Sequence, residues 1–319
     1  MKREICAMFA SLVLLLPGCN IQRHLLYFPG NTTVSDVERY ASVNDLAMWP
    51  DGSSDYRGIV SRNGPKGFRG TVVVFHGNGG PAVFRVAYIT ALELRGFRVV
   101  LAEYPGYGGR PGELSEKSLV ADARRTVALA KKAFGGPVYL WGESMGCGVA
   151  AALADDQEIQ PDGVVMLTPW DSLLNVAKAI YPWLPVRLFV RDVYDNVENL
   201  ARFKGPVAVI MAARDEIIPN RLTEHLYASL PGPKKLWIFE RAGHNDWPSG
   251  PGLAWWDEVI NFFHSHSSKN PVQPLSRGYS GLDAAKEDHY TVLIRQRPPS
   301  RGGSALGPLL LGKTDQNGA

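Results

Sequence analysis

The stretch VYLWGESMGCGVAAAL, residues 138–153, contains the most informative pattern in the chain. It begins with the apolar and aromatic residues typical of a buried strand and ends with the small apolar residues of a packed helix. Ser144 lies between the two parts, flanked by Gly142 and Gly146. Glycines at these positions remove Cβ atoms that would clash in a sharp strand-to-helix turn. The pattern predicts a turn that presents the Ser144 hydroxyl, although a plain glycine-rich turn with an incidental serine would fit it too.

Similar apolar runs recur on both sides of this stretch and alternate with longer segments of helical pattern. The runs begin at Thr71, Arg98, Pro137, Gly163, Pro206 and Lys235. The intervening segments that suit crossover helices are 81–95, 115–133, 146–155 and 221–230. Because near-continuous apolarity is typical of strands buried on both faces, we expect an α/β fold with a mainly parallel central sheet flanked by helices.

The flanking segments complete the expected domain. Residues 38–60 are more polar and alternating, which favours antiparallel edge strands. Residues 252–266 carry apolar side chains at helical spacing, so we expect a last helix that closes the sheet. Its apolar face would comprise Trp255, Trp256, Val259, Ile260 and Phe263. Residues 267–319 are rich in Gly, Pro, Ser and charge, and we expect them to be a mostly disordered tail after a domain that spans residues 19–266.

Composition excludes some classes of function. The chain has 319 residues, 45% of them hydrophobic, which allows one large domain of roughly 250 residues. It contains 34 Lys and Arg against 31 Asp and Glu, a net charge of +3. No basic cluster is interleaved with aromatic residues, so the sequence does not favour nucleic-acid binding.

The first twenty residues, MKREICAMFASLVLLLPGCN, have the pattern of a secretory signal. Lys2 and Arg3 precede an apolar run from Ile5 to Leu16 that is too short to cross a bilayer comfortably. The run ends just before Cys19, in a context that resembles the lipobox of bacterial lipoproteins. We therefore expect residues 1–18 to be a lipoprotein signal peptide and Cys19 to be acylated. An ordinary signal peptide or an uncleaved anchor is the alternative.

The three cysteines fit this expectation. Cleavage would remove Cys6 and acylation would use Cys19, so Cys147 alone would remain for other chemistry. Neither a disulfide nor a cysteine metal site could then form. The acyl chains would hold the protein on the outer side of a bacterial membrane. Because Asn20 rather than Asp follows Cys19, the resemblance indicates the outer membrane in a cell that has two.

Candidate catalytic residues follow the ends of the predicted strands, where α/β sheets gather their active groups. A serine hydroxyl needs a histidine base that a carboxylate orients. His244, in ERAGHNDW after the last run, is the best base, although it could merely cap a following helix. Asp215, in AARDEIIP, gives the order Ser, Asp, His along the chain. Asp171, in TPWDSL, is a rival acid that could also cap the next helix.

Attack by Ser144 would create an oxyanion that two N–H groups must stabilise. The N–H of Met145, directly after the serine, is one candidate. The other is the N–H of Asn78, within FHGNGG at residues 75–80. A phosphate loop would also be glycine-rich, but the Lys-Ser/Thr pair of such loops is missing and the spacing does not match a dinucleotide-binding loop.

Taken together, the motifs FHGNGG, YPGYGGRPG, GESMG, ARDEIIP and AGHNDW resemble the α/β-hydrolases, in particular serine aminopeptidase-like hydrolases and α/β-hydrolase-domain depalmitoylases. The resemblance covers residues 24–266. It implies a triad of Ser144, Asp215 and His244, with Asn78 and Met145 as oxyanion donors and no cofactor or metal. A serine nucleophile in place of an aspartate makes dehalogenase and epoxide-hydrolase chemistry unexpected.

The substrate is less determined. The segment AIYPWLPVRLFV, residues 179–190, could form a short apolar cap over the site or could pack on the sheet. We expect a membrane-anchored serine hydrolase of the bacterial cell envelope that cleaves carboxylic esters or thioesters, including acylated substrates, through an acyl-enzyme. A peptidase or amidase, and a non-catalytic surface-binding lipoprotein, are the alternatives. The sequence leaves the oligomeric state open.

Overall fold

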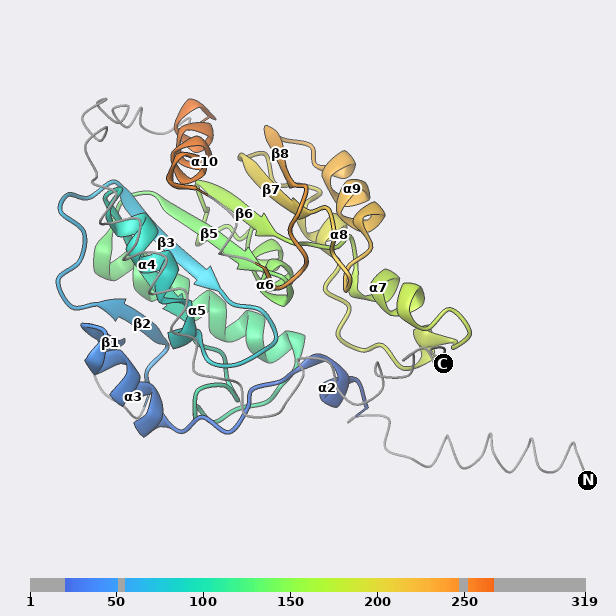
Figure 1. The fold of residues 1–319 in the computed structure, drawn as a ribbon, viewed down its shortest axis with the longest axis horizontal. Helices are drawn as coiled ribbons and strands as arrows, with labels where there is room; N and C mark the ends of the chain where they lie inside the picture. The colour runs from blue at the N-terminus through green and yellow to red at the C-terminus, as the bar shows by residue number, and fades with distance from the viewer. Residues whose placement is uncertain (1–20, 51–54, 247–251, 267–319) are drawn as a thin grey trace, which may run out of the picture.

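The computed structural model describes residues 21–50, 55–246 and 252–266, and its centre is an eight-stranded sheet (Figure 1). The strands are β1 Leu46–Trp49, β2 Gly58–Ser61, β3 Gly70–Phe75, β4 Phe97–Ala102, β5 Val138–Glu143, β6 Gly163–Leu167, β7 Val207–Ala212 and β8 Lys234–Phe239. Their spatial order is β1-β2-β4-β3-β5-β6-β7-β8. The pairs β1–β2 and β2–β4 are antiparallel, and every other neighbouring pair is parallel.

The register brings the carboxyl ends of the central strands to one edge of the sheet. Phe75 at the end of β3 lies beside Gly142 of β5, and Glu143 lies beside Leu167 at the end of β6. Ser144 follows at once, and its N–H donates to the Leu167 carbonyl at 2.9 Å. Loops after several strands therefore meet around Ser144, as expected for a parallel sheet.

Alternating side chains of each strand face two separate cores. In β3, Val73 and Phe75 belong to one core, whereas Val72 and Val74 belong to the other. Burial on both faces explains why the strands have nearly continuous apolar sequences. The first core is covered by α5 Glu116–Phe134, α6 Met145–Ala152, α8 Asn196–Leu200 and α9 Asn220–Ser229. The second is covered by α3 Val34–Val43, η1 Ala82–Arg85, α4 Val86–Glu93 and α10 Leu253–His266.

The remaining helical elements of the described residues are α2 Ile21–Leu26, α7 Leu173–Ile180 and the 3₁₀ turn η2 Val186–Leu188. Figure 1 shows α2 and α7 toward the same side of the molecule, away from the edge strands β1 and β2. No helix in the described ranges is both long and apolar enough to cross a membrane.

The α/β architecture predicted from the sequence is confirmed. The predicted closing helix is α10, and all five residues of its predicted apolar face are buried. The prediction of edge strands throughout 38–60 was wrong at its start, because α3 continues to Val43. Thr33 and Asp36 form a capping box that starts this helix, and Val37 and Ala41 bury one face of it. The proposed signal peptide 1–18 and tail 267–319 lie outside the described residues.

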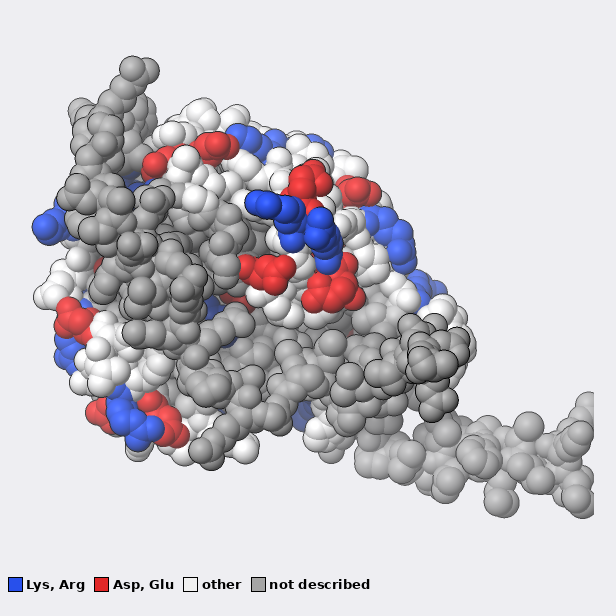
Figure 2. Space-filling model, in the orientation of Figure 1, with Lys and Arg blue, Asp and Glu red and all other residues white. Residues whose placement is uncertain are grey.

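Surface charge on the described residues is mixed. Figure 2 shows basic and acidic side chains interspersed on the visible face rather than a continuous field of one sign. This distribution agrees with the small net charge of +3.

Candidate active site

Ser144 occupies a strained turn between β5 and α6. Its backbone has φ 51° and ψ −113°, a conformation that L-residues rarely adopt. A Cβ on Gly146 would overlap the Phe75 carbonyl, and a Cβ on Gly142 would lie 2.5 Å from the Cys147 Cα. The two glycines therefore let α6 start directly against the ends of β3 and β5, which is why the turn has the sequence G-x-S-x-G.

The side chains of Ser144, His244 and Asp215 form one hydrogen-bonded series. His244 Nε2 lies 2.9 Å from Ser144 Oγ, and His244 Nδ1 lies 2.7 Å from Asp215 Oδ2. In this arrangement Nδ1–H donates to the carboxylate, so Nε2 accepts the serine proton. The His244 and Asp215 side chains are only 6% and 3% exposed, which shields the series from water.

Hydrogen bonds with neighbouring residues hold the acid and the base in place. The other oxygen of Asp215, Oδ1, accepts hydrogen bonds from the N–H groups of Ile217 and Ile218 at 2.9 and 2.7 Å. The His244 N–H donates to Glu216 Oε2 at 3.1 Å. These contacts fix the loops after β7 and β8 relative to each other.

The rival acid Asp171 lies in a different set of contacts. Its Oδ2 lies 2.9 Å from His225 Nδ1 and accepts from the Asn175 side chain at 2.9 Å. Ser172, not Asp171, is the N-cap of α7. The structure therefore brings Asp215 to His244 and gives Asp171 a second histidine, on α9, that the sequence pattern did not connect with it.

The two candidate oxyanion donors come from the turns after β5 and β3. Met145 is the first residue of α6, so its N–H has no acceptor within the helix. The Asn78 carbonyl accepts from the Phe28 N–H and the Tyr107 hydroxyl, both at 2.9 Å, and its side-chain amide donates to the Leu26 carbonyl at 3.0 Å. Among the described residues, none accepts a hydrogen bond from the Asn78 N–H.

The loop that carries Asn78 lies against the serine. A Cβ added to Gly77 would be 3.6 Å from the Ser144 Cβ, which is ordinary contact distance. Gly77 therefore lies directly against the turn that carries Ser144.

An ion pair that the sequence analysis missed connects the two turns. Arg85 donates to the Gly79 carbonyl through Nη1 and to Glu143 Oε1 through Nη2, both at 3.1 Å. Burial opposes ionisation of Glu143, but Arg85 and the hydroxyl of Tyr88 outweigh it and lower the pKa of Glu143 below its usual range. The sequence signal that could have revealed this pair is Glu143, a charged residue at the end of the buried strand β5.

His76 connects the loop after β3 to Glu103, which follows β4. Its Nε2 lies 3.1 Å from Glu103 Oε1 and its Nδ1 lies 2.7 Å from the Gly77 carbonyl, and both side chains are buried. Tyr104 donates from its hydroxyl to the His76 carbonyl at 2.9 Å. His76 therefore holds the loop that contains Asn78.

Other reactive groups in the described part of the chain are arranged differently. The buried Cys147 thiol donates to the carbonyls of Gly142 and Leu167, and burial raises its pKa well above the usual range. No group of three His, Cys, Asp or Glu residues in the described ranges could hold a metal ion. Cys19 lies outside the described residues.

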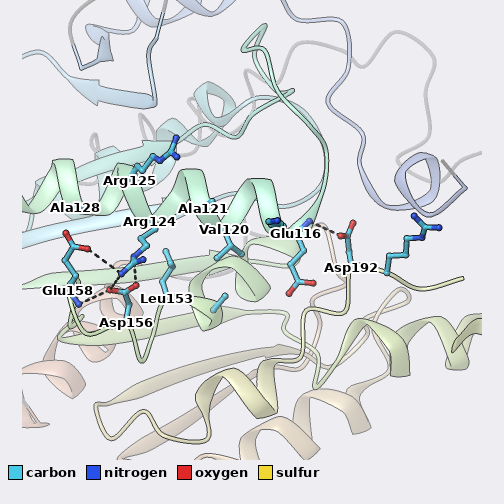
Figure 3. A pocket seen from close by; sticks show the side chains of 13 residues that line it. Glu116, Val120, Ala121, Arg124, Arg125, Ala128, Leu153, Asp156, Glu158 and Asp192 are labelled. Atoms are coloured by element: carbon cyan, nitrogen blue, oxygen red, sulfur yellow. Dashed lines mark hydrogen bonds and ion pairs between the residues drawn. The ribbon is translucent and has the colours of Figure 1, made fainter. Parts of the chain in front are cut away.

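A large open groove lies along α5, away from this site. It has a volume of about 810 Å³ and is lined mainly by residues of α5 and by the segments around Asp156 and Asp192. Figure 3 shows Arg124 at one end in contact with Asp156 and Glu158. None of Ser144, Asp215 and His244 lines it, so the groove does not contain the candidate chemistry.

A mainly parallel sheet, a strained serine turn after a central strand and a histidine after the last strand define the α/β-hydrolase fold. The chain belongs to the α/β-hydrolase superfamily, and residues 66–185 match the family model for serine aminopeptidase, S33.

Relatives of known sequence include both uncharacterised and named proteins. The chain is 34% identical over 245 residues to an uncharacterised protein of Mycobacterium tuberculosis, and the match covers 76% of this chain and 86% of that protein. It is 29% identical over 175 residues to lysophosphatidylserine lipase ABHD12 of Danio rerio. That match covers 49% of this chain and 46% of the lipase, so the chain spans about half the length of this relative.

Solved structures share the fold at low sequence identity. An esterase of Pyrococcus furiosus superposes with a TM-score of 0.54 at 18% identity, covering 76% of this chain and 98% of the esterase. A thermophilic esterase of Thermogutta terrifontis, solved with butyrate bound, gives 0.54 at 16% identity, covering 70% and 96%. The protein is a hydrolase of the α/β-hydrolase fold, and it shares that fold with these two esterases.

Proposed function

We propose that the protein is a serine hydrolase that cleaves carboxylic esters or thioesters through an acyl-enzyme, with Ser144, His244 and Asp215 as its triad. The observation that carries this proposal is the continuous hydrogen-bonded series from Ser144 Oγ through His244 to Asp215. A binding protein has no need of a nucleophile, a base and an acid in this order, nor of a serine in a strained turn.

In the proposed reaction Ser144 Oγ attacks the carbonyl carbon while His244 Nε2 takes the hydroxyl proton. The N–H groups of Asn78 and Met145 would stabilise the oxyanion that forms. Collapse breaks the bond to the leaving group, which receives the proton from His244. A water molecule, deprotonated by the same nitrogen, then attacks the acyl-serine. The bond from the acyl carbon to Ser144 Oγ breaks, the carboxylic acid leaves, and His244 returns the proton to Oγ.

The named relatives support esters over amides. The two solved structures are esterases and ABHD12 is named a lysophosphatidylserine lipase, whereas the family model takes its name from a serine aminopeptidase. A peptidase or amidase is therefore the second candidate.

Assays with matched p-nitrophenyl esters and p-nitroanilide amides test both candidates. We expect turnover of esters and thioesters, little turnover of amides, and loss of ester turnover in Ser144→Ala. Faster turnover of the amides would favour the peptidase. An inert wild-type protein of normal stability would favour a non-catalytic lipoprotein.

We also propose that Cys19 is acylated after removal of residues 1–18, which would attach the domain to the cell-envelope membrane, the outer one in a cell with two. The lipobox-like sequence before Cys19 supports this proposal. Mass spectrometry of the mature N-terminus is the test, and an unmodified Cys19 would contradict the proposal.

A further inference from the structure

The end of α7 and the segment that follows it expose large apolar side chains that do not pack on the sheet. We call residues 180–193 the tip. Trp183 and Leu188 are each 78% exposed, and Ile180 and Val193 are 38% and 39% exposed. Packing on the sheet, one of the two roles expected for this segment from the sequence, is therefore wrong for Trp183 and Leu188. Apolar exposure gathered in one segment is typical of a surface that binds a partner.

The tip is a compact series of turns. The Leu188 N–H donates to the Pro185 carbonyl at 3.0 Å, and the Val190 N–H donates to the Val186 carbonyl at 2.9 Å. Val186 is only 4% exposed and attaches the turn to the domain. Trp183 and Leu188 are thus presented by ordered backbone, which lowers the conformational entropy lost when they become buried.

The tip lies beside the start of the described chain. The Gln22 side chain, in α2, accepts from the Arg191 N–H at 2.7 Å and donates to the Asp192 carbonyl at 2.8 Å. Leu25 of the same helix is 47% exposed. Because α2 begins two residues after Cys19, an acyl anchor there would be covalently attached next to the tip. Figure 1 shows α2 and α7 on the same side of the molecule.

Charges around the tip favour an anionic surface. Arg187 and Arg191 belong to the tip, and Lys178 lies in the last turn of α7. The acidic Asp192 is held inward, since its carboxylate accepts from the Tyr27 hydroxyl at 2.8 Å and from the Glu116 N–H at 3.0 Å. An exposed Trp and Leu flanked by the exposed Arg187 suit the headgroup region of a bilayer that contains anionic lipids.

The same side leads to the candidate oxyanion loop. After α2, the Phe28 N–H donates to the Asn78 carbonyl at 2.9 Å, and the Gly80 N–H donates to the Phe28 carbonyl at 3.1 Å. The segment that would join an anchor to the domain therefore ends on the loop beside Ser144. An anchor at Cys19 would therefore be joined to this loop through α2 and Phe28.

We propose that the tip docks on an anionic bilayer surface, so that the substrate is the ester or thioester of a membrane-resident amphiphile. The substrate part of this inference rests on the proposed hydrolase function, whereas the docking part does not.

Fluorescence quenching tests the docking. The full chain is reconstituted into vesicles of phosphatidylcholine and phosphatidylglycerol that contain brominated phosphatidylcholine, whose bromines quench tryptophan within the bilayer. We expect quenching in the wild type that is largely lost in Trp183→Phe. The matched control adds Phe68→Trp to Trp183→Phe. Phe68 is also exposed, at 50%, but it lies just before β3, at the amino ends of the parallel strands. Quenching should not return in this control.

Each other outcome overturns the docking. Quenching that Trp183→Phe does not reduce would place the tip outside the bilayer and leave a protein partner as its occupant. Quenching that Phe68→Trp restores would show that the domain has no preferred orientation.

Hydrolysis tests the substrate class separately. We expect Trp183→Ser to lower turnover of a vesicle-embedded long-chain ester about tenfold, roughly the effect of losing one buried apolar side chain, and to leave a water-soluble short-chain ester unaffected. An equal effect on both esters, or none, would overturn the proposed substrate class. Absence of turnover with either ester would contradict the proposed function, whatever the quenching shows.

Discussion

Replacing Gly146 by alanine tests whether the close contact between α6 and β3 positions the candidate chemistry. The added Cβ would lie 2.6 Å from the Phe75 carbonyl carbon and 2.9 Å from the His76 carbonyl oxygen, both backbone atoms within the sheet or directly after it. The Phe75 carbonyl oxygen would be closer still and would overlap the Cβ. Reaching an ordinary contact of about 3.4 Å therefore requires the start of α6 to move by more than about 0.8 Å, with a packing cost of about 1–3 kcal/mol. The better helix propensity of alanine offsets at most about 1 kcal/mol of this cost.

The displacement would carry the Met145 N–H and Ser144 Oγ away from the loop that contains Asn78. Because a misplacement of about 1 Å can cost about 100-fold in rate, we expect Gly146→Ala to lower kcat for a p-nitrophenyl ester by about 100-fold. The melting temperature should fall by about 2–8 °C. Gly252→Ala is the matched control, since a Cβ there meets nothing within 4 Å. Wild-type kcat in a folded Gly146→Ala variant would refute the reasoning.

Three further predictions follow from individual contacts. Asp215→Asn should lower kcat about 10³–10⁴-fold because it removes the carboxylate that orients the base. Asp171→Asn should lower kcat less than tenfold, since Asp171 contacts His225 instead. A larger loss of kcat in Asp171→Asn than in Asp215→Asn would reverse the assignment of the acid. Arg85→Met should lower kcat about 10- to 100-fold with KM nearly unchanged, since it releases the Gly79 carbonyl, and a rise in KM alone would contradict this role. The pKa of His264 is lowered to about 4 by burial and by the nearby Arg69, so the folded state binds fewer protons than the unfolded state between pH 6.5 and 4. The free energy of unfolding in urea should therefore fall by about 1–2 kcal/mol, allowing for partial exposure, as pH falls through this window, and His264→Gln should remove most of the fall.

Local patterns were sufficient to predict the sheet and the positions of the candidate chemical groups. Strands buried on both faces have a clear apolar signature, and the glycines around Ser144 follow from contacts with the neighbouring backbone that few other residues permit. The rule that loops meet at the carboxyl ends of parallel strands then placed His244 and Asp215 near Ser144.

Contacts between distant segments could not be predicted in the same way. Asp171 and Asp215 follow the neighbouring strands β6 and β7, so the sequence offers both as partners of His244. The structure shows that Asp171 instead contacts His225 on α9. The exposure of Trp183 depends on the turns of the tip, although its sequence suits a buried segment equally well. The Arg85–Glu143 pair joins residues 58 positions apart and has no short motif.

The most direct test of the central claim is the site of covalent labelling by a fluorophosphonate, which reacts with a serine hydroxyl activated by a neighbouring base. Mass spectrometry of the labelled full chain should find the adduct on the peptide that contains Ser144, and Ser144→Ala should carry none. A folded wild-type protein that stays unlabelled, or an adduct on a different residue that persists in Ser144→Ala, would contradict the proposal that Ser144 is the nucleophile.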